Sequence, residues 1–167
     1  MKQWFIPKVY AKTVFDINYE SLLSEGINRL CFDLDNTLLE RSKSIPSWKT
    51  KSLIQNLKEK GFTVLLLSNN ASGIRVTRVA EFLEVDGLFR CFKPFPWIYH
   101  KLEDAGFLVE NTAVIGDQLL MDILGGNIHG YSTIYVDQLG PELTLFRKLY
   151  IRSEKLLLKF IRRFFEK

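Results

Sequence analysis

Short apolar runs alternate with amphipathic segments along most of the chain. The apolar runs are too continuous for half-exposed strands, and they predict buried strands of a parallel sheet at residues 29–34, 63–67, 86–92, 112–115 and 133–136. The intervening segments repeat apolar residues at spacings of three and four, which predicts helices at residues 48–60, 74–83, 97–105 and 119–128. This alternation is typical of an α/β fold, here a doubly wound, Rossmann-like parallel sheet of five strands with helices on both faces.

The composition is that of an ordinary globular chain. It has 167 residues, of which 47% are hydrophobic and 25% are charged, and this excludes disordered and low-complexity classes. No apolar run approaches the roughly 20 residues that span a bilayer, and the first residues lack the apolar core of a signal peptide. We therefore expect a cytoplasmic protein in which Cys31 and Cys91 are buried as small apolar side chains and form no disulfide.

Acidic residues follow the first and fourth predicted strands, at the edge where ligands of doubly wound sheets bind. Asp33 and Asp35 are two residues apart, so their side chains share one face of an extended backbone. Asp117 and Asp122 follow the fourth strand. Buried carboxylates need a cation between them, and Mg²⁺ prefers oxygen ligands. The sequence therefore predicts a divalent metal at this edge of the sheet.

The second and third strands end in groups that suit an anion. Ser68, Asn69 and Asn70 supply hydroxyl and amide donors, and Lys93 adds a positive charge. Each group also has an ordinary structural explanation, such as a turn, a helix N-cap or a solvated lysine. Because several such explanations would have to coincide at one sheet edge, we favour a joint catalytic role.

Together these residues resemble the four motifs of the haloacid dehalogenase (HAD) superfamily of phosphoryl-transfer enzymes. The motifs correspond to Asp33-x-Asp35-x-Thr37, to Ser68, to Lys93, and to Gly116-Asp117 with Asp122. Dehalogenase members lack the second acid of the first motif, so the resemblance indicates a phosphatase. Ten residues separate Thr37 from the helix expected at residue 48, and residues 68–93 have room for one helix and one strand. We therefore expect no large cap domain and an open site.

The resemblance implies a covalent, magnesium-dependent mechanism. Asp33 would attack phosphorus and form an aspartyl-phosphate. Asp35 would act as general acid towards the leaving oxygen and then as general base towards water. The metal Mg²⁺ would be held by Asp33, Asp117 and the backbone carbonyl of Asp35.

The resemblance also implies how the phosphate is bound. Lys93 would neutralise the phosphoryl oxygens and assist catalysis, and Ser68, Asn69 and Thr37 would bind these oxygens. Asp122 would orient Lys93 or a water at the metal. The substrate would be a phosphomonoester.

A larger part of the chain, residues 14–155, resembles the YqeG-type and phosphatidylglycerophosphate phosphatase family. The similar segments are residues 32–38, 67–70, 93–94, 116–119 and 125–127. This family converts phosphatidylglycerophosphate to phosphatidylglycerol, which implies an anionic phospholipid substrate and peripheral contact with a membrane surface. The chain departs from the family pattern at Met121, where Thr is expected, and at Ile128, where Arg is expected.

A basic region follows the expected phosphatase domain of residues 1–146. Residues 147–167 contain eight Lys and Arg residues against Glu154 and Glu166, a net charge of +6, whereas the rest of the chain has −2. Apolar residues recur there at helical spacing, which predicts a basic amphipathic helix packed partly on the domain. Its basic face suits solvent, an anionic lipid surface or RNA, and these three interpretations stay open.

Three other functions compete with a lipid phosphatase. The same chemistry suits a soluble phosphometabolite or a phosphoprotein. A signalling receiver domain shares the sheet and an Asp/Thr/Lys set, but its acids follow other strands. A non-catalytic module that binds RNA or protein through the tail would not need the intact Asp33, Asp35, Lys93 and Asp117, so nucleic acid is not an expected partner.

Overall fold

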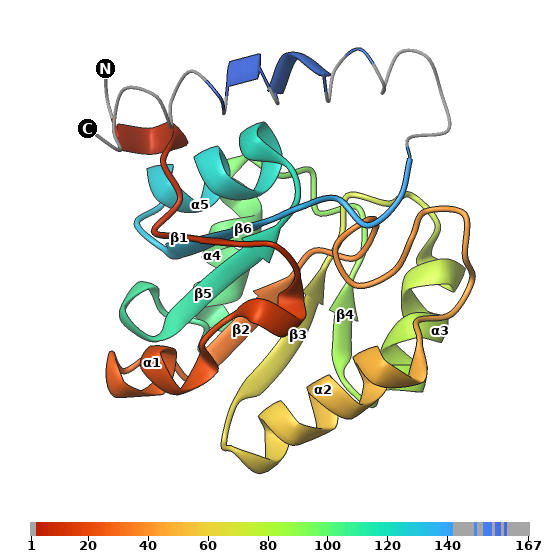
Figure 1. Cartoon of the computed structure of the whole chain (residues 1–167). Helices are drawn as coiled ribbons and strands as arrows, with labels where there is room; N and C mark the ends of the chain where they lie inside the picture. The colour runs from red at the N-terminus through yellow and green to blue at the C-terminus, as the bar shows by residue number, and fades with distance from the viewer. Residues whose placement is uncertain (1–2, 142–148, 150–151, 155, 158, 160–167) are drawn as a thin grey trace.

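The computed structural model describes residues 3–141, 149, 152–154, 156–157 and 159. Six parallel strands form one sheet in the order β1-β6-β5-β2-β3-β4 (Figure 1). The strands are β1 (Val9–Ala11), β2 (Arg29–Phe32), β3 (Thr63–Leu67), β4 (Asp86–Leu88), β5 (Thr112–Gly116) and β6 (Ser132–Val136). The predicted α/β class and parallel sheet are confirmed, but the prediction of five strands is wrong, since the sheet has six.

The additional strand is β1, which lies at one edge of the sheet and pairs with β6. It has only three residues, all half-buried, and Lys8 and Lys12 flank it. Such a short edge strand lacks the buried apolar run that revealed the others. At the opposite edge, β4 ends at Leu88 instead of the predicted residue 92, because Arg90 and Phe92 have positive φ angles and turn the chain.

Helices connect the strands and cover both faces of the sheet. They are α1 (Tyr19–Ser24), α2 (Trp48–Glu59), α3 (Gly73–Leu83), α4 (Pro96–Asp104) and α5 (Leu124–Ile128). Short helical turns are η1 (Gln3–Phe5), η2 (Val14–Asp16), η3 (Val109–Asn111) and η4 (Leu119–Ile123). The helix predicted at residues 119–128 thus consists of a π-helical turn, η4, followed by the short α-helix α5.

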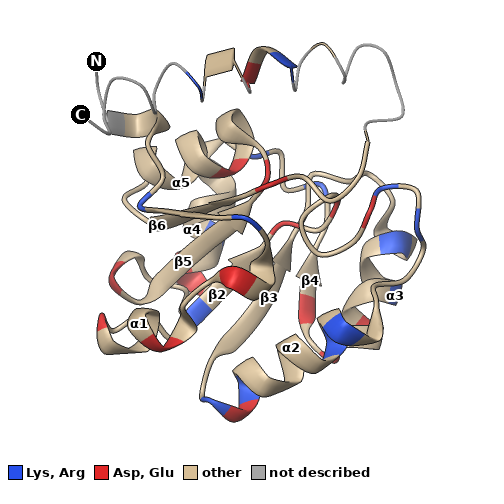
Figure 2. Cartoon of the chain, viewed as in Figure 1, with Lys and Arg blue, Asp and Glu red and all other residues tan. Residues whose placement is uncertain are grey.

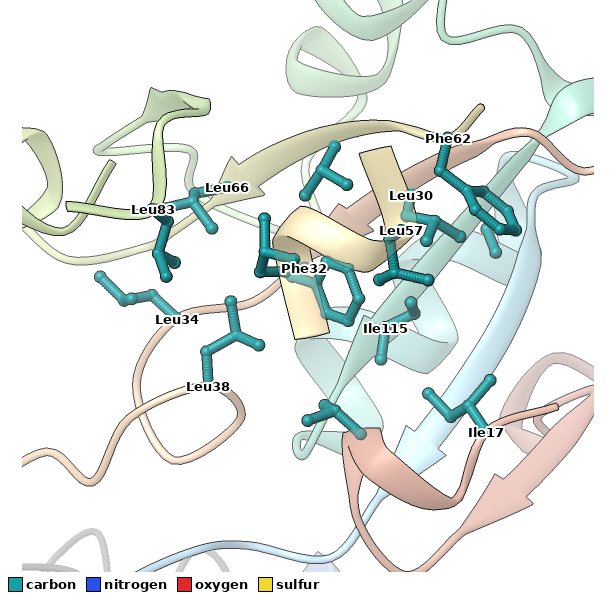
Figure 3. Packing of buried hydrophobic residues seen from close by; sticks show 14 of the residues in the cluster. Ile17, Leu30, Phe32, Leu34, Leu38, Leu57, Phe62, Leu66, Leu83 and Ile115 are labelled. Atoms are coloured by element: carbon teal, nitrogen blue, oxygen red, sulfur yellow. The ribbon is translucent and has the colours of Figure 1, made fainter. Parts of the chain in front are cut away.

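Alternate strand residues pack into cores on opposite faces. Leu30 and Phe32 of β2 pack with side chains of α2 and α3 in the larger core, which Figure 3 shows from close by. Cys31, between them, faces the second core with Ile98 and Leu102 of α4. Cys31 and Cys91 are buried and free, as predicted.

The site lies where the winding of the sheet reverses. From β2 the chain continues to β3 and β4 in one direction, whereas β5 and β6 lie on the other side of β2. In doubly wound sheets, ligands bind outside the carboxyl ends of the strands at this switch point. Here those ends lead into Asp33 after β2 and Asp117 after β5. Residues 33–47 and 68–85 insert no large cap over this edge in the described part of the chain.

Most of the helix predicted at residues 147–167 lies outside the described residues. Among those described, Glu154 is buried, and its carboxylate accepts a hydrogen bond of 2.8 Å from the backbone N–H of Leu120. Leu157 packs against the small apolar cluster of Leu119, Ile123 and Tyr135. No helix in the described residues combines the length and apolar character needed to cross a membrane.

Candidate active site

A buried lysine lies between two carboxylates at the carboxyl edge of the sheet. Lys93 Nζ is 2.8 Å from Asp33 Oδ1 and 2.5 Å from Asp122 Oδ1. Burial lowers the pKa of Lys93, but attraction by Asp122 and Asp33 outweighs burial, so the pKa lies above its usual value. The lysine is therefore a permanent cation beside Asp33.

Asp117 adds a third carboxylate to this cluster. Asp33, Asp117 and Asp122 each place an oxygen within 4.8 Å of the others. The Thr37 hydroxyl lies between two of them, 3.4 Å from Asp33 Oδ2 and 3.3 Å from Asp117 Oδ1. Asp117 Oδ2 is buried and has no hydrogen-bond partner among the described residues. Three carboxylates thus face one ammonium group, which leaves the cluster with excess negative charge.

The pKa values reflect this excess. Burial raises the pKa of Asp33 to about 6, even though Lys93 attracts the ionised form. Burial and repulsion from Asp33 and Asp122 raise the pKa of Asp117 well above its usual value. Holding both acids ionised without a further cation is therefore costly.

The donor set fits a hard divalent cation. All the available ligand atoms are oxygens, which Mg²⁺ prefers. Both oxygens of Asp122 already have partners. Its Oδ1 contacts Lys93, and its Oδ2 accepts a 3.1 Å hydrogen bond from the backbone N–H of Gln118. Asp33 and the unpaired oxygen of Asp117 are the acids best placed to hold such an ion among the described residues, and their role as metal ligands stays a prediction.

Two glycines let these groups approach each other. A Cβ atom at Gly116 would overlap the Asp122 carboxylate. A Cβ atom at Gly125 would overlap the Tyr99 hydroxyl and crowd Pro94. The first glycine thus makes room for the partner of Lys93, and the second lets α5 pack against the loop that carries Lys93.

Ser68 and Asn69 lie on the loop after β3. Ser68 is buried, and its hydroxyl accepts a 3.1 Å hydrogen bond from the Asn70 N–H. The Asn69 side chain holds the main chain of Lys93, donating to its carbonyl at 3.0 Å and accepting from its N–H at 2.7 Å. Asn69 therefore positions the lysine loop, and direct contact with phosphate stays a prediction.

Asp35 lies in a separate cluster with two arginines that sequence reasoning missed. Arg75 donates from Nε and Nη2 to Asp35 Oδ1 at 3.1 and 2.9 Å, and Arg41 Nη1 donates to Oδ2 at 3.2 Å. Asn70 Nδ2 donates to Oδ2 at 2.7 Å. Arg41 lies in the loop after β2 and Arg75 in the first turn of α3. Neither follows a strand directly, so the strand-end criterion did not select them.

The two clusters open on one cleft of about 130 Å³. It is lined by Asp33, Asp35, Arg41, Ser68, Asn69, Asn70, Gln118 and Met121. Met121, one of the departures from the family pattern, therefore faces the cleft directly. Ile128, the other departure, is 47% exposed and belongs to α5, outside the cleft lining.

Two comparisons of the sequence with known proteins point to one enzyme family. The model of the haloacid dehalogenase-like hydrolases matches residues 41–130. A Bacillus subtilis (strain 168) protein named "Probable phosphatase YqeG" is 34% identical over 137 residues, which cover 81% of this chain and 79% of that protein.

Solved structures share the fold. The 3-deoxy-D-manno-octulosonate 8-phosphate phosphatase of Moraxella catarrhalis, solved with magnesium, phosphate and sugar, has 17% identity and a TM-score of 0.55 over 89% of this chain and 99% of that one. A HAD-like family hydrolase of Porphyromonas gingivalis has 15% identity and a TM-score of 0.55, and the match covers 76% of this chain and 98% of that one. The family model and the Bacillus relative show that the chain belongs to the haloacid dehalogenase-like hydrolases, as a phosphatase of the YqeG type.

Proposed function

We propose that this phosphatase hydrolyses a phosphomonoester through an aspartyl-phosphate on Asp33, with Mg²⁺ as cofactor. The observation that carries the proposal is the placement of Asp33 beside a buried lysine, with a second acid, Asp35, on the same cleft. A carboxylate nucleophile needs a cation to offset the charge of the phosphoryl group that it approaches. Lys93 supplies that charge at 2.8 Å from Asp33.

In the first step, an oxygen of Asp33 forms a bond to phosphorus while the bond to the leaving oxygen breaks. Asp35 transfers a proton to that leaving oxygen, so the product departs as a neutral alcohol. Lys93 and Ser68 bind the phosphoryl oxygens as charge shifts onto them. The Thr37 hydroxyl, which contacts both Asp33 and Asp117, holds the two carboxylates in their relative positions.

In the second step, Asp35 removes a proton from water, whose oxygen attacks phosphorus. The bond between phosphorus and Asp33 breaks, inorganic phosphate leaves, and Asp33 is again a carboxylate. Asp35 therefore gains back the proton that it gave in the first step.

The cofactor site is assigned to the carboxylates that lack a second cation. Asp33, the unpaired Asp117 Oδ2 and the backbone carbonyl of Asp35 would hold Mg²⁺. When bound, the ion would neutralise charge on the phosphoryl group. Asp122 keeps its place beside Lys93 and orients that lysine.

The favoured substrate is an amphiphilic phosphomonoester of the phosphatidylglycerophosphate kind, and a soluble phosphometabolite is the alternative. Apolar side chains exposed on segments that follow the carboxyl ends of β3 and β4 support the lipid. Large apolar side chains are exposed on the first turn of α3, on the loop after β4 and on α4: Ile74 (76%), Phe89 (46%), Phe92 (56%), Phe95 (62%) and Trp97 (46%). Such exposed apolar side chains suit contact with the acyl region around a lipid phosphate.

Phosphate release from a small panel tests this proposal. The panel contains phosphatidylglycerophosphate in mixed micelles, glycerol 3-phosphate and p-nitrophenyl phosphate, each with Mg²⁺ and with EDTA. Asp33→Asn is the test variant, and Asp104→Asn, on the exposed end of α4, is the matched control. We expect Mg²⁺-dependent release by the wild type and the control and none by Asp33→Asn. Release by Asp33→Asn at the wild-type rate would contradict the proposal.

A further inference from the structure

The turn η4 connects the lysine of the site to the C-terminal tail. Asp122, the partner of Lys93, belongs to η4 and is fully buried. Its Oδ2 accepts a hydrogen bond from the Gln118 N–H, and its own N–H donates to the Gln118 carbonyl at 3.0 Å. These two contacts fix Asp122 to the start of the turn, whereas its Oδ1 contacts Lys93. The position of η4 therefore sets the position of the acid that holds the lysine.

The tail supplies a hydrogen-bond acceptor to the start of this turn. The first N–H groups of a helical turn have no carbonyl partner within it, so they need acceptors from elsewhere. Glu154 places Oε1 2.8 Å from the Leu120 nitrogen, two residues before Asp122. Among the described residues of the tail, Glu154 is the single acid, beside the basic Arg152 and Lys159 (Figure 2). It is also buried, and a hydrogen bond to a buried carboxylate is stronger than one between neutral groups.

Apolar contacts from both ends of the chain hold the same turn. Leu119 and Ile123 of η4 form a buried cluster with Tyr135 of β6. Phe5 of η1 and Leu157 of the tail pack against this cluster. Figure 1 shows η1 and the described pieces of the tail at the end of the molecule where α5 lies. The turn is thus held by segments that are distant in sequence and take no part in the lining of the cleft.

Two residues of η4 belong to the site itself. Met121 lines the cleft, and Asp122 Oδ1 lies 2.5 Å from Lys93 Nζ. A Cβ atom at Gly116 would overlap the Asp122 carboxylate, so the end of β5 packs closely against this acid. Close packing of this kind transmits a displacement from one group to the next. A shift of η4 at Leu120 would therefore move the wall of the cleft and the partner of Lys93 together.

We propose that Glu154 is a positioning residue of the phosphatase, which acts through η4 and Asp122 on Lys93. The Glu154 carboxylate fixes the Leu120 N–H and with it the turn. The turn keeps Asp122 in place, and Asp122 holds the ammonium group of Lys93 beside the proposed nucleophile. The tail thus contributes to turnover without touching the substrate. This inference rests on the proposed function, in which Lys93 binds the phosphoryl group, and it adds a residue outside the cleft that controls this lysine.

Two signals in ¹H–¹⁵N nuclear magnetic resonance spectra test this coupling without substrate. The Leu120 amide reports the hydrogen bond, and the Lys93 ammonium group reports its effect on the site. A buried ammonium group held by two carboxylates exchanges its protons slowly, because exchange requires local opening. The test variants are Glu154→Ala and Glu154→Gln. Glu59→Ala is the matched control, because Glu59 is exposed at the end of α2.

We expect the Lys93 ammonium protons to exchange about tenfold faster in Glu154→Ala than in the wild type and the control, the usual effect of losing a hydrogen bond to a charged group. Glu154→Gln should stay within about threefold of the wild type, because its amide oxygen still accepts from the Leu120 N–H. If Glu154→Ala does not fold, Glu154→Asp, which keeps the charge on a shorter side chain, takes its place.

Two results would overturn the proposal. In the first, Glu154→Ala moves the Leu120 signal and leaves the Lys93 signal unchanged. In the second, exchange accelerates equally at the backbone amides of β3 and β4, because Glu154 would then only stabilise the fold as a whole.

Turnover then tests the route through Asp122. Glu154→Ala should lower kcat/KM for p-nitrophenyl phosphate by about tenfold, and Asp122→Asn, which changes the direct partner of Lys93, should lower it further. The double variant should lose about as much as Asp122→Asn alone, because both changes act on the lysine by one route. Losses that multiply would contradict this route. Absence of phosphate release by the wild type would refute the proposed function, whereas the Lys93 signal would still decide the role of Glu154.

Discussion

Two clusters of charged residues share one cleft and differ in how their carboxylates are paired. In the inner cluster of Asp33, Asp117, Asp122 and Lys93, three carboxylates surround one ammonium group. In the outer cluster of Asp35, Arg41, Arg75 and Asn70, two guanidinium groups surround one carboxylate. The carboxylates of the inner cluster therefore need a further cation, whereas Asp35 in the outer cluster already has two cationic partners and an amide donor.

The largest expected effect comes from the inner cluster. Asp33→Asn should lower kcat on the order of 1,000-fold or more, because the covalent step loses its nucleophile. The fold should persist, since Lys93 keeps its contact with Asp122. Phosphate release and thermal unfolding of the purified variant check both statements, and residual turnover above a few per cent would contradict the assignment.

The next effect concerns the outer cluster. Asp35→Asn should lower kcat by about 10²–10⁴-fold on an alkyl phosphate, which needs a proton on its leaving oxygen. On p-nitrophenyl phosphate the first step should be much less impaired, because that leaving group departs without a proton. Rapid-quench measurement of the first turnover on the two substrates checks this difference, because hydrolysis of the aspartyl-phosphate also needs Asp35 and would slow the steady state of both. Equal losses of the first-turnover rate on both substrates would contradict the role of Asp35 as general acid.

Removing one acid of the inner cluster should stabilise the protein when metal is absent. Asp33 has a pKa of about 6 in the fold, above its usual 3.8, and the pKa of Asp117 is also raised. The folded state thus binds more protons than the unfolded chain in this range, so the free energy of unfolding falls as pH rises through it. Above pH 6 Asp117→Asn should unfold at a higher temperature than the wild type in EDTA, by about 2–4 °C per kcal/mol.

Thermal unfolding at pH 5 and pH 7.5, with EDTA or Mg²⁺, checks this third expectation. The advantage of Asp117→Asn in EDTA should shrink at pH 5, and Mg²⁺ should stabilise the wild type more than the variant. Asp104→Asn is the control for loss of an exposed acid. If the variant is less stable than the wild type at pH 7.5 in EDTA, burial and charge repulsion at Asp117 do not destabilise the fold, which contradicts this expectation.

The smallest effect on both clusters is expected from the basic tail. Deleting residues 155–167 leaves Glu154 and its hydrogen bond to Leu120 in place. Activity on p-nitrophenyl phosphate should therefore change little, whereas binding to vesicles of anionic lipid should fall, because the deleted residues carry much of the positive charge. Co-sedimentation with and without high salt measures this, and equal binding by both proteins would contradict the interpretation of the tail as a lipid-binding helix.

How far the sequence predicts the structure differs between the two clusters. The inner cluster can be predicted because its acids stand at strand ends. The strands β2 and β5 have buried apolar runs, and Asp33 and Asp117 come directly after them. The strand β1 gave no such run. The outer cluster depends on contacts between distant segments, since Arg75 reaches Asp35 from the next helix. An arginine in the first turn of a helix has no periodic or motif signal, so only the folded structure shows it.

The covalent role of Asp33 can be measured most directly by trapping the intermediate. The Asp35→Asn variant is mixed with p-nitrophenyl phosphate and Mg²⁺, quenched in acid and digested, and its peptides are analysed by mass spectrometry. The first step should proceed with this activated leaving group, while attack by water is slowed. We expect phosphate on the peptide that contains Asp33, and none in the Asp33→Asn/Asp35→Asn double variant. Release of phosphate without a phosphorylated peptide, or with phosphate on another residue, would contradict the mechanism.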